Sequence, residues 1–264
     1  MQPTFRTPVL CVTVDVDLAD GTAAAKDQSA LTTAARSLQS ILGHHGVPAA
    51  WAMPDPAASP LAESILNASA AHELALLADD SWAREGDSRG KFFQRLSGQL
   101  EHARARGIQI SNLALARGAV IGHTDLLVKH GVQLVRDDPS TLRKTGWYGQ
   151  FTAGRSKAQL PTPMRWGLWR LTPSICLPGN SFTAVRRCLD STSSAAGLIT
   201  LVLDLNELAA GGRSAMRLVD RVVSMLARRV ERKSLTIEVP RDLAAHLSPT
   251  RQTAPARSIL HRAA

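Results

Sequence analysis

The sequence predicts an α/β domain built around a mainly parallel sheet. From residue 8 to residue 239, short apolar segments rich in β-branched residues alternate with longer segments in which apolar residues recur every three or four positions. Strands that alternate with helices need crossover connections, and such connections leave consecutive strands parallel. The alternation fits either a closed β/α barrel or an open, doubly wound sheet.

The first half of the chain shows this alternation most clearly. Residues 8–16 (PVLCVTVDV) predict a buried strand, and apolar residues at helical spacing over 28–43 predict the helix that follows it. Gly43 and Gly46 mark the end of that helix. The other elements expected in this half are strand 49–53, helix 60–68, strand 72–78, helix 88–106, strand 112–116, helix 123–130 and strand 132–136.

The second half begins with a break in the pattern. Glycine and proline recur throughout 139–180, and Trp147, Trp166 and Trp169 lie within it, so we expect a long excursion over one end of the barrel. Regular structure then returns as helix 181–190, strand 198–205, helix 214–232 and strand 235–239.

The length and composition favour one domain. A chain of 264 residues with 44% hydrophobic composition can bury one large core, which we expect to span residues 8–247. Residues 248–264, rich in Pro, Thr, Arg and Ala, predict a disordered basic tail. No run approaches the roughly 18 uncharged apolar residues of a membrane span, and the first residues do not resemble a signal peptide, so we expect a cytoplasmic protein without membrane association. The three scattered cysteines predict small core residues rather than a disulfide framework.

The positive charge raises the question of a polyanionic partner. The formal net charge is +9, and clustered basic charge can bind nucleic acid. However, the arginines are spread along the chain, and Arg217, Arg221, Arg228 and Arg232 share one face of a predicted helix, which is typical of a solvated face. Nucleic acid is therefore disfavoured as a partner. The chain also lacks the GxGxxG, Walker, HExxH and GxSxG motifs of nucleotide-binding proteins, zinc peptidases and serine hydrolases.

Carboxylates follow three predicted strands at their carboxyl ends. Asp15 and Asp17 end the first strand on the same face, Asp79 and Asp80 follow the strand 72–78, and Asp204 ends the strand 198–205. The carboxyl ends of parallel barrel strands meet at one rim, where active sites lie. Asp15, Asp17 and Asp204 are therefore candidate catalytic residues, and the converging carboxylates could bind a cation or raise one another's pKa. The alternatives are that the aspartates after the first and third strands cap turns and helices, and that Asp204 simply starts the following loop.

An arginine and several tryptophans could complete such a rim. Arg117 follows strand 112–116 and could hold a carboxylate ionised, or could simply be an exposed arginine. Trp82, Trp147 and Trp166 are candidates for stacking on sugar rings, together with Asp79 and Asp80 as substrate-binding residues. The alternative for the tryptophans is that they anchor the long loop to the barrel.

Five segments, taken in order, resemble the polysaccharide deacetylase (NodB-homology) family. They are CVTVDVDLADG (11–21), HHGVPAAWAMP (44–54), HELALLADDSW (72–82), LALARGAV (113–120) and GLITLVLDLNEL (197–208). The resemblance implies a distorted β/α barrel of the glycoside hydrolase/deacetylase type, which removes acetyl groups from amino sugars or hydrolyses related non-peptide C–N bonds. It places Asp15 on the family's catalytic base and Arg117 on the arginine that contacts this base.

The same resemblance shows where the chain departs from the family. A metal-binding aspartate is replaced by Val16, the two metal-ligand histidines by Leu77 and Ser81, and the catalytic histidine of the late strand by Asp204. Leucine cannot coordinate a dication, and a catalytic zinc site commonly needs imidazole ligands. We therefore expect no metal cofactor, unless Asp17 and Asp80 contribute to a recomposed oxygen-rich site suited to Mg²⁺ or Mn²⁺.

Three functional hypotheses follow. The first is a pseudoenzyme that keeps the deacetylase fold and binds a carbohydrate or amino-sugar ligand, or serves as an accessory partner of another protein. The second is an active amino-sugar N-deacetylase with a recomposed carboxylate site. The third is a basic module that binds nucleic acid or protein.

Overall fold

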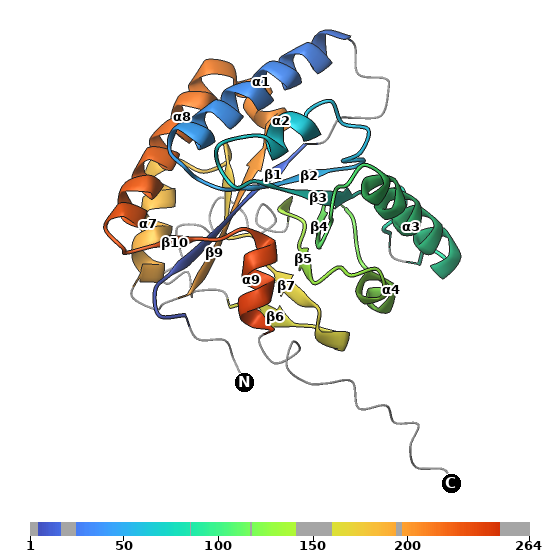
Figure 1. The fold of residues 1–264 in the computed structure, drawn as a ribbon. Coiled ribbons are helices and arrows are strands. Elements are labelled where there is room, and N and C mark those ends of the chain that lie inside the picture. Colours follow the sequence, from blue (N-terminus) through green and yellow to red (C-terminus); the bar gives the residue numbers. More distant parts are fainter. Residues whose placement is uncertain are drawn as a thin grey trace.

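The computed structural model describes residues 5–16, 25–84, 86–116, 118–140, 160–193 and 197–248. Within these residues the strands form one ten-stranded sheet in the order β6-β7-β5-β4-β3-β2-β1-β9-β8, with β10 also paired to β1 (Figure 1). Every pairing is parallel except that of β6 with β7. The strands are β1 (Val9–Asp15), β2 (Ala50–Met53), β3 (Glu73–Ala78), β4 (Asn112–Leu115), β5 (Leu134–Arg136), β6 (Thr162–Pro163), β7 (Trp169–Leu171), β8 (Ile175–Leu177), β9 (Leu198–Asp204) and β10 (Thr236–Ile237).

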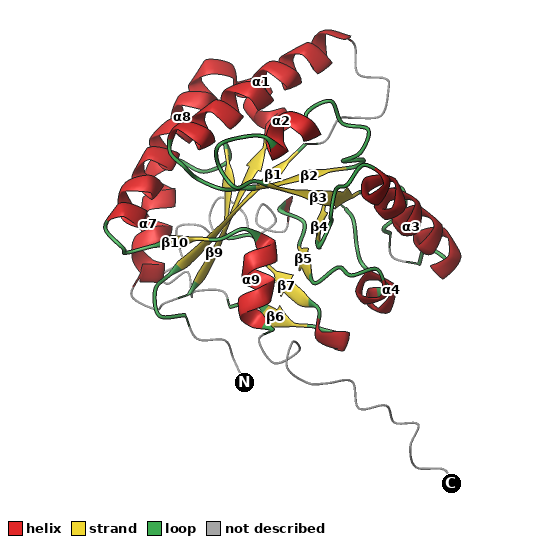
Figure 2. Ribbon diagram, viewed as in Figure 1, coloured by secondary structure: helices red, strands yellow, loops and turns green. Residues whose placement is uncertain are grey.

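Helices cover the outside of this sheet. Figure 2 shows α1, α2, α7 and α8 gathered on one side and α3 and α4 on another. The helices are α1 (Ala25–His44), α2 (Ala62–Leu66), α3 (Arg89–Ala105), α4 (Thr124–Lys129), α7 (Phe182–Ser193), α8 (Leu205–Glu231) and α9 (Pro240–Leu247), with a 3-10 turn at Arg165–Gly167. The predicted alternation of strands and helices is thus confirmed.

Three details differ from the sequence prediction. Residues 160–180 were expected in a long excursion, but they supply β6, β7 and β8 to the sheet, because strands of two or three residues interrupted by prolines leave no readable period. Helix α8 begins at Leu205, directly after β9, and contains a kink at Gly212, where φ is +54°. The third difference is α9, a short helix that the sequence analysis did not identify.

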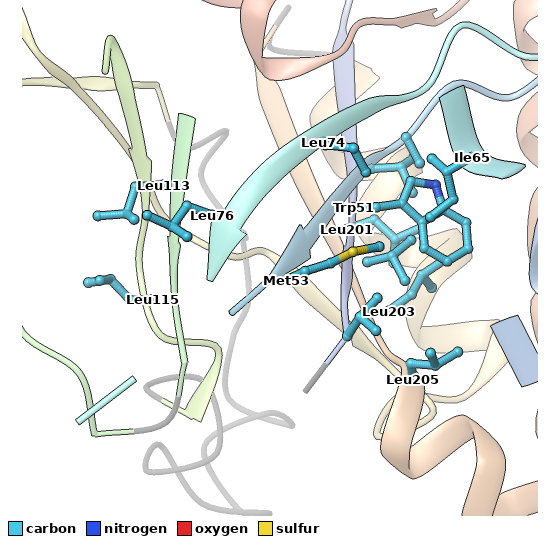
Figure 3. Close-up of a cluster of buried hydrophobic side chains, with 14 of the residues drawn as sticks. Trp51, Met53, Ile65, Leu74, Leu76, Leu113, Leu115, Leu201, Leu203 and Leu205 are labelled. Carbon is cyan, nitrogen blue, oxygen red and sulfur yellow. The ribbon is translucent and has the colours of Figure 1, made fainter. Parts of the chain in front are cut away.

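The sheet curls into a barrel-like shape, and its two faces carry different residues. Alternation along β1 points Leu10, Val12 and Val14 toward the helices, where they join the main apolar core. Figure 3 shows part of this outer core, in which Trp51 of β2 lies near Ile65 of α2. The opposite face of the strands points into the barrel.

Small side chains line the middle of the barrel interior, and α9 fills one end. Ala52, Ala75, Leu77 and Ala114 form a compact apolar cluster contributed by β2, β3 and β4. At the amino ends of the strands, α9 packs its apolar face against residues of β1, β5, β7 and β9, forming the cluster Val9, Cys11, Leu134, Leu171, Leu198, Leu243, Ala244 and Leu247. Among the described residues, the amino end and the middle of the barrel are thus filled, and space remains toward the carboxyl end.

The interior also contains a buried glutamate. Asn112 Nδ2 donates to Glu73 Oε1 at 2.6 Å, and the backbone N–H of Arg241, in the first turn of α9, donates to Glu73 Oε2 at 3.3 Å. Burial raises the pKa of Glu73 to about 7, although the N–H and the charge of Arg241 act in the opposite direction. Glu73 thus connects β3, β4 and α9. The free-energy cost of burying its carboxyl group increases as pH rises and the group becomes charged.

No helix among the described residues is both long enough and apolar enough to cross a membrane. Apart from Ser248, the predicted basic tail lies outside the described residues.

The raised pKa of Glu73 predicts how the stability of the protein responds to pH. The folded-state pKa of about 7 lies above the ordinary value of 4.5, so the contribution of Glu73 to stability is greatest below pH 4.5 and falls as pH rises toward 7. The substitution Glu73→Gln removes this titration. We expect its free energy of unfolding, relative to that of the unmodified protein, to increase by up to roughly 3 kcal/mol between these pH values. Urea denaturation at several pH values measures this difference, with Glu101→Gln on the exposed face of α3 as the control. A difference that does not vary with pH would contradict the prediction.

Candidate active site

A cavity of about 150 Å³ opens at the carboxyl end of the barrel. It is lined by polar and acidic residues from the ends of β1, β5 and β9, together with a few small or apolar ones. The lining residues are Asp15, Leu77, Ala116, Asp138, Pro139, Ser140, Cys176, Val202, Asp204, Asn206 and Glu207. Asp15 and Asp204 are thus brought together, as the strand ends predicted.

The centre of the site is a buried ion pair between Asp15 and Arg136. Arg136 Nη2 donates to both carboxylate oxygens of Asp15, at 2.6 and 2.8 Å, and Nη1 donates to the backbone oxygen of Asp137 at 3.1 Å. The Arg136 side chain is 2% exposed and that of Asp15 is 11% exposed. The pair therefore lies in an interior where charge interactions are strong and desolvation is costly.

This contact also shows how strongly the sheet is curved. Strands β4, β3 and β2 lie between β5 and β1 in the sheet order. A flat sheet would place β5 about 19 Å from β1, given the spacing of neighbouring strands. Direct contact between Arg136 and Asp15 requires the sheet to curl around the site.

Burial and neighbouring carboxylates oppose the ionisation of Asp15. Burial raises the pKa of Asp15 to about 6, and Asp204 and Asp138 raise it as well, while the charge and hydrogen bonds of Arg136 lower it. One guanidinium therefore offsets much of the charge of three neighbouring carboxylates. Asp15 remains mostly ionised at neutral pH.

Asp138 and Asp204 also organise the rim. Asp138 accepts hydrogen bonds from the backbone N–H groups of Gly118, at 3.0 Å, and Ser140, at 2.7 Å. Gly118 has φ +83°, a conformation that favours glycine, so the loop after β4 reaches Asp138 at no steric cost. Asp204 caps α8 by accepting from the Glu207 N–H at 3.1 Å, while it also lines the cavity. Asp204 thus has the predicted rim position, and it caps α8 instead of starting a loop, which was the alternative.

Asp79 and Asp80 do not line the cavity. Asp79 Oδ1 accepts from the Ser81 N–H at 2.9 Å, which stabilises the turn after β3. The exposed Asp80 side chain lies near Gly118 and 3.9 Å from Arg84 Nη2. The capping alternative describes Asp79 better than the predicted substrate-binding role.

The two described tryptophan candidates also lie away from the cavity. Trp82 is 4% exposed and packs on Phe92, with ring centroids 5.4 Å apart, so its environment is that of a core residue. Trp166 is 63% exposed but precedes β7, at the amino end of that strand, opposite the end where Asp15 and Arg136 meet. These placements disagree with a sugar-stacking role at this cavity. Asp17, Arg117 and Trp147 lie outside the described residues.

Arg136 is the residue that the sequence analysis missed. It ends the predicted strand 132–136 and is followed by Asp137 and Asp138. An ionisable residue at the carboxyl end of a buried strand is the same signal that identified Asp15, and Arg136 shares the inward face with Leu134. The contact that the resemblance implies for Arg117 stays a prediction, because Arg117 lies outside the described residues.

The described residues do not fit the metal that the resemblance implies. Among them, no group of three His, Cys, Asp or Glu side chains is arranged to hold an ion. Leu77, at the position of a ligand histidine, is 1% exposed and lines the cavity with its apolar side chain. Ser81 does not line it and instead donates its hydroxyl to Asp79. Both oxygens of Asp15 are already bound to a cation, the guanidinium of Arg136.

The ion pair predicts a specific pattern of stability in variants. Arg136→Met leaves a buried carboxylate without its cation, so we expect the free energy of unfolding at pH 7 to fall by about 3–5 kcal/mol. The double variant Asp15→Leu/Arg136→Met should recover most of this loss, because no unpaired buried charge remains. The control is Arg170→Met, since Arg170 pairs with Asp137 but its side chain is 52% exposed, and it should lose at most about 1 kcal/mol. Denaturant unfolding measures all four proteins, and a double variant no more stable than Arg136→Met would contradict the account.

The comparisons with known proteins agree with this geometry at the level of the fold. No family model matches the chain, and no curated protein sequence matches it. Among solved structures, a Mycobacterium smegmatis protein assigned as a polysaccharide deacetylase has a TM-score of 0.66 at 15% identity, over 97% of this chain and 94% of that one. A family 4 carbohydrate esterase from Bacillus anthracis has a TM-score of 0.53 at 11% identity, over 93% of this chain and 86% of that one.

A third similar structure is described as a mutant of a family 4 carbohydrate esterase pseudoenzyme with restored enzymatic activity. Its TM-score is 0.51 at 9% identity, over 90% of this chain and 68% of that one. At such identities the likeness is one of fold alone. The similar structures and the curled parallel sheet together confirm the fold that the sequence motifs predicted: the chain has the β/α-barrel fold of the polysaccharide deacetylases.

Proposed function

We propose that this protein is a non-hydrolytic relative of the deacetylases that binds acetylated amino-sugar units at the carboxyl end of its barrel. The observation that carries the proposal is Leu77, a buried apolar side chain that lines the cavity with Asp15 at the position where the family has a metal-ligand histidine. A general base must be within hydrogen-bond reach of the proton it accepts. Arg136 orients Asp15 and holds it ionised, as the family's arginine does for its base, so hydrolysis would still require a metal to activate the attacking water.

The environment of Asp15 supports the same conclusion. In metal-dependent amide hydrolysis, the metal polarises the carbonyl and lowers the pKa of the attacking water. The described residues around Asp15 supply an apolar side chain, Leu77, and a guanidinium, Arg136, instead of ligands. Neither can make water a strong nucleophile at neutral pH.

The remaining groups of the cavity suit binding. Asp204, Asp138 and Asn206 present oxygen and amide groups, and such groups accept and donate hydrogen bonds to sugar hydroxyls and amides. Leu77, Ala116 and Val202 add an apolar surface of the kind a methyl group requires. A volume of about 150 Å³ admits part of a sugar unit, such as an acetamido group, rather than an oligosaccharide.

One observation favours the alternative of an active hydrolase. The pKa of about 6 for Asp15 lies close to the operating pH, which suits a general base. In this alternative, Asp17 and Asp80 would complete an oxygen-rich metal site with Asp15. The two functions make different predictions about acetate release and about binding.

Titration with N-acetylglucosamine oligomers tests the proposal. We expect calorimetry to show binding of the acetylated oligomer and much weaker binding of the deacetylated one. Asn206→Ala should weaken the binding about tenfold through loss of a polar contact in the cavity, while Asn67→Ala on the exposed end of α2 should leave it unchanged.

The same samples, supplied with Zn²⁺, Co²⁺ or Mn²⁺, should release no acetate. Acetate release that Asp15→Asn abolishes would establish the hydrolase alternative instead. An absence of both binding and hydrolysis would remove the carbohydrate-binding proposal and leave the role of an accessory to another protein.

A further inference from the structure

A second site-like feature lies in the helical layer, between α7 and α8. These helices pack along one side of the sheet (Figure 1) and leave a groove of about 470 Å³ between them. This volume is in the range of sites that bind small ligands. Arginines dominate the lining, which consists of Phe182, Arg186, Asp220, Arg221, Ser224, Met225, Arg228, Arg229 and Arg232.

The positive charge of the groove is only partly balanced. Asp190 contacts Arg229 and lies 3.8 Å from Arg186 Nε, so one carboxylate serves two arginines. Asp220 is 3.2 Å from His45 Nε2, in the turn that follows α1. Across the described part of the chain, no carboxylate lies within salt-bridge distance of Arg221, Arg228 or Arg232. An anion in the groove would therefore meet cations that are not already neutralised.

Two of the groove arginines are held in place by neighbouring side chains, one by an aromatic ring and the other by a carboxylate. The guanidinium of Arg221 lies over the ring of Phe182, 4.7 Å from its centroid, and this contact orients the cation without neutralising it. Arg229 is held by Asp190 and its side chain is only 18% exposed. Such preorganisation lowers the entropic cost of binding a ligand.

The spacing of the three arginines without a carboxylate partner in the described part of the chain indicates a ligand with more than one anionic group. Arg221, Arg228 and Arg232 are separated by seven and four residues, so they lie on one face of α8. Along the helix axis they span about 16 Å, which is longer than one phosphate group. Guanidinium groups match the geometry of phosphate oxygens, and they bind these in preference to neutral ligands.

We propose that the groove between α7 and α8 binds a small ligand that carries two or more phosphate groups. Nucleic acid fits the site less well, because a groove of about 470 Å³ is confined between two helices. Single-strand binding also commonly uses exposed aromatic rings for base stacking, whereas the described groove contains one aromatic side chain, Phe182, already covered by Arg221. This site is separate from the barrel cavity and does not depend on the carbohydrate proposal.

Calorimetric titration of the full chain with pyrophosphate tests this inference. The double variant Arg221→Gln/Arg228→Gln removes two exposed groove arginines, and we expect it to weaken pyrophosphate binding at least tenfold. The control, Arg95→Gln/Arg106→Gln, removes the same charge from exposed positions at α3 and should change the affinity less than twofold.

Each other outcome overturns the inference. Equal loss in the two double variants would mean that net charge alone attracts the anion. Orthophosphate binding as tightly as pyrophosphate would remove the requirement for two phosphate groups. A 12-nucleotide single strand that binds more tightly than pyrophosphate, with affinity falling steeply as salt rises, would identify a nucleic-acid surface instead. No detectable binding of pyrophosphate would end the proposal.

Discussion

The structure depends on one buried ion pair at the carboxyl end of the barrel. Arg136 holds Asp15 from the far side of the curled sheet, and both side chains are almost inaccessible to solvent. Three carboxylates, Asp15, Asp138 and Asp204, share this small region, and their mutual repulsion would disfavour the fold without a cation. A guanidinium supplies that charge here, and it does so as a permanent part of the chain rather than as an exchangeable ion.

The packing of the barrel interior determines where this ion pair and the cavity lie. Helix α9 fills the amino end, and small alanines together with Leu77 fill the middle, while the cavity lies at the carboxyl rim. Glu73 binds the first turn of α9 from inside the barrel and thus couples the closed end to β3 and β4. The polar groups that remain at the open end are few and fixed, which suits recognition of a small chemical group. The chain has the fold of the polysaccharide deacetylases, and our proposal is that the cavity binds its ligand without hydrolysing it.

The sequence alone predicted the parts of the structure that depend on local patterns. The strands from Val9–Asp15 to Leu134–Arg136 follow from apolar runs, and Asp15 and Asp204 follow from their places at strand ends. The Asp15–Arg136 contact joins residues 121 positions apart, and only the curvature of the sheet decides which of several inward-facing residues meet. Similarly, β6, β7 and β8 have two or three residues each in a stretch interrupted by glycine and proline, so no period can be identified there. The eight-residue helix α9 was also missed, although Pro240 in its first turn and the spacing of Leu243 and Leu247 indicate it. The sequence predicts a sugar-binding role for Trp82, whereas the structure buries its side chain. The sequence alone does not distinguish a buried tryptophan from a sugar-binding one.

Metal content tests the central claim most directly, because that claim is that the residues around Asp15 do not hold the metal that the family uses. The purified protein would be incubated with Zn²⁺, Mn²⁺ or Co²⁺, dialysed, and measured by mass spectrometry beside an Asp15→Asn variant. We predict far less than one metal ion per chain in both proteins. One tightly held ion per chain that is lost in the variant would contradict the account, since it would show that Asp15 binds a metal.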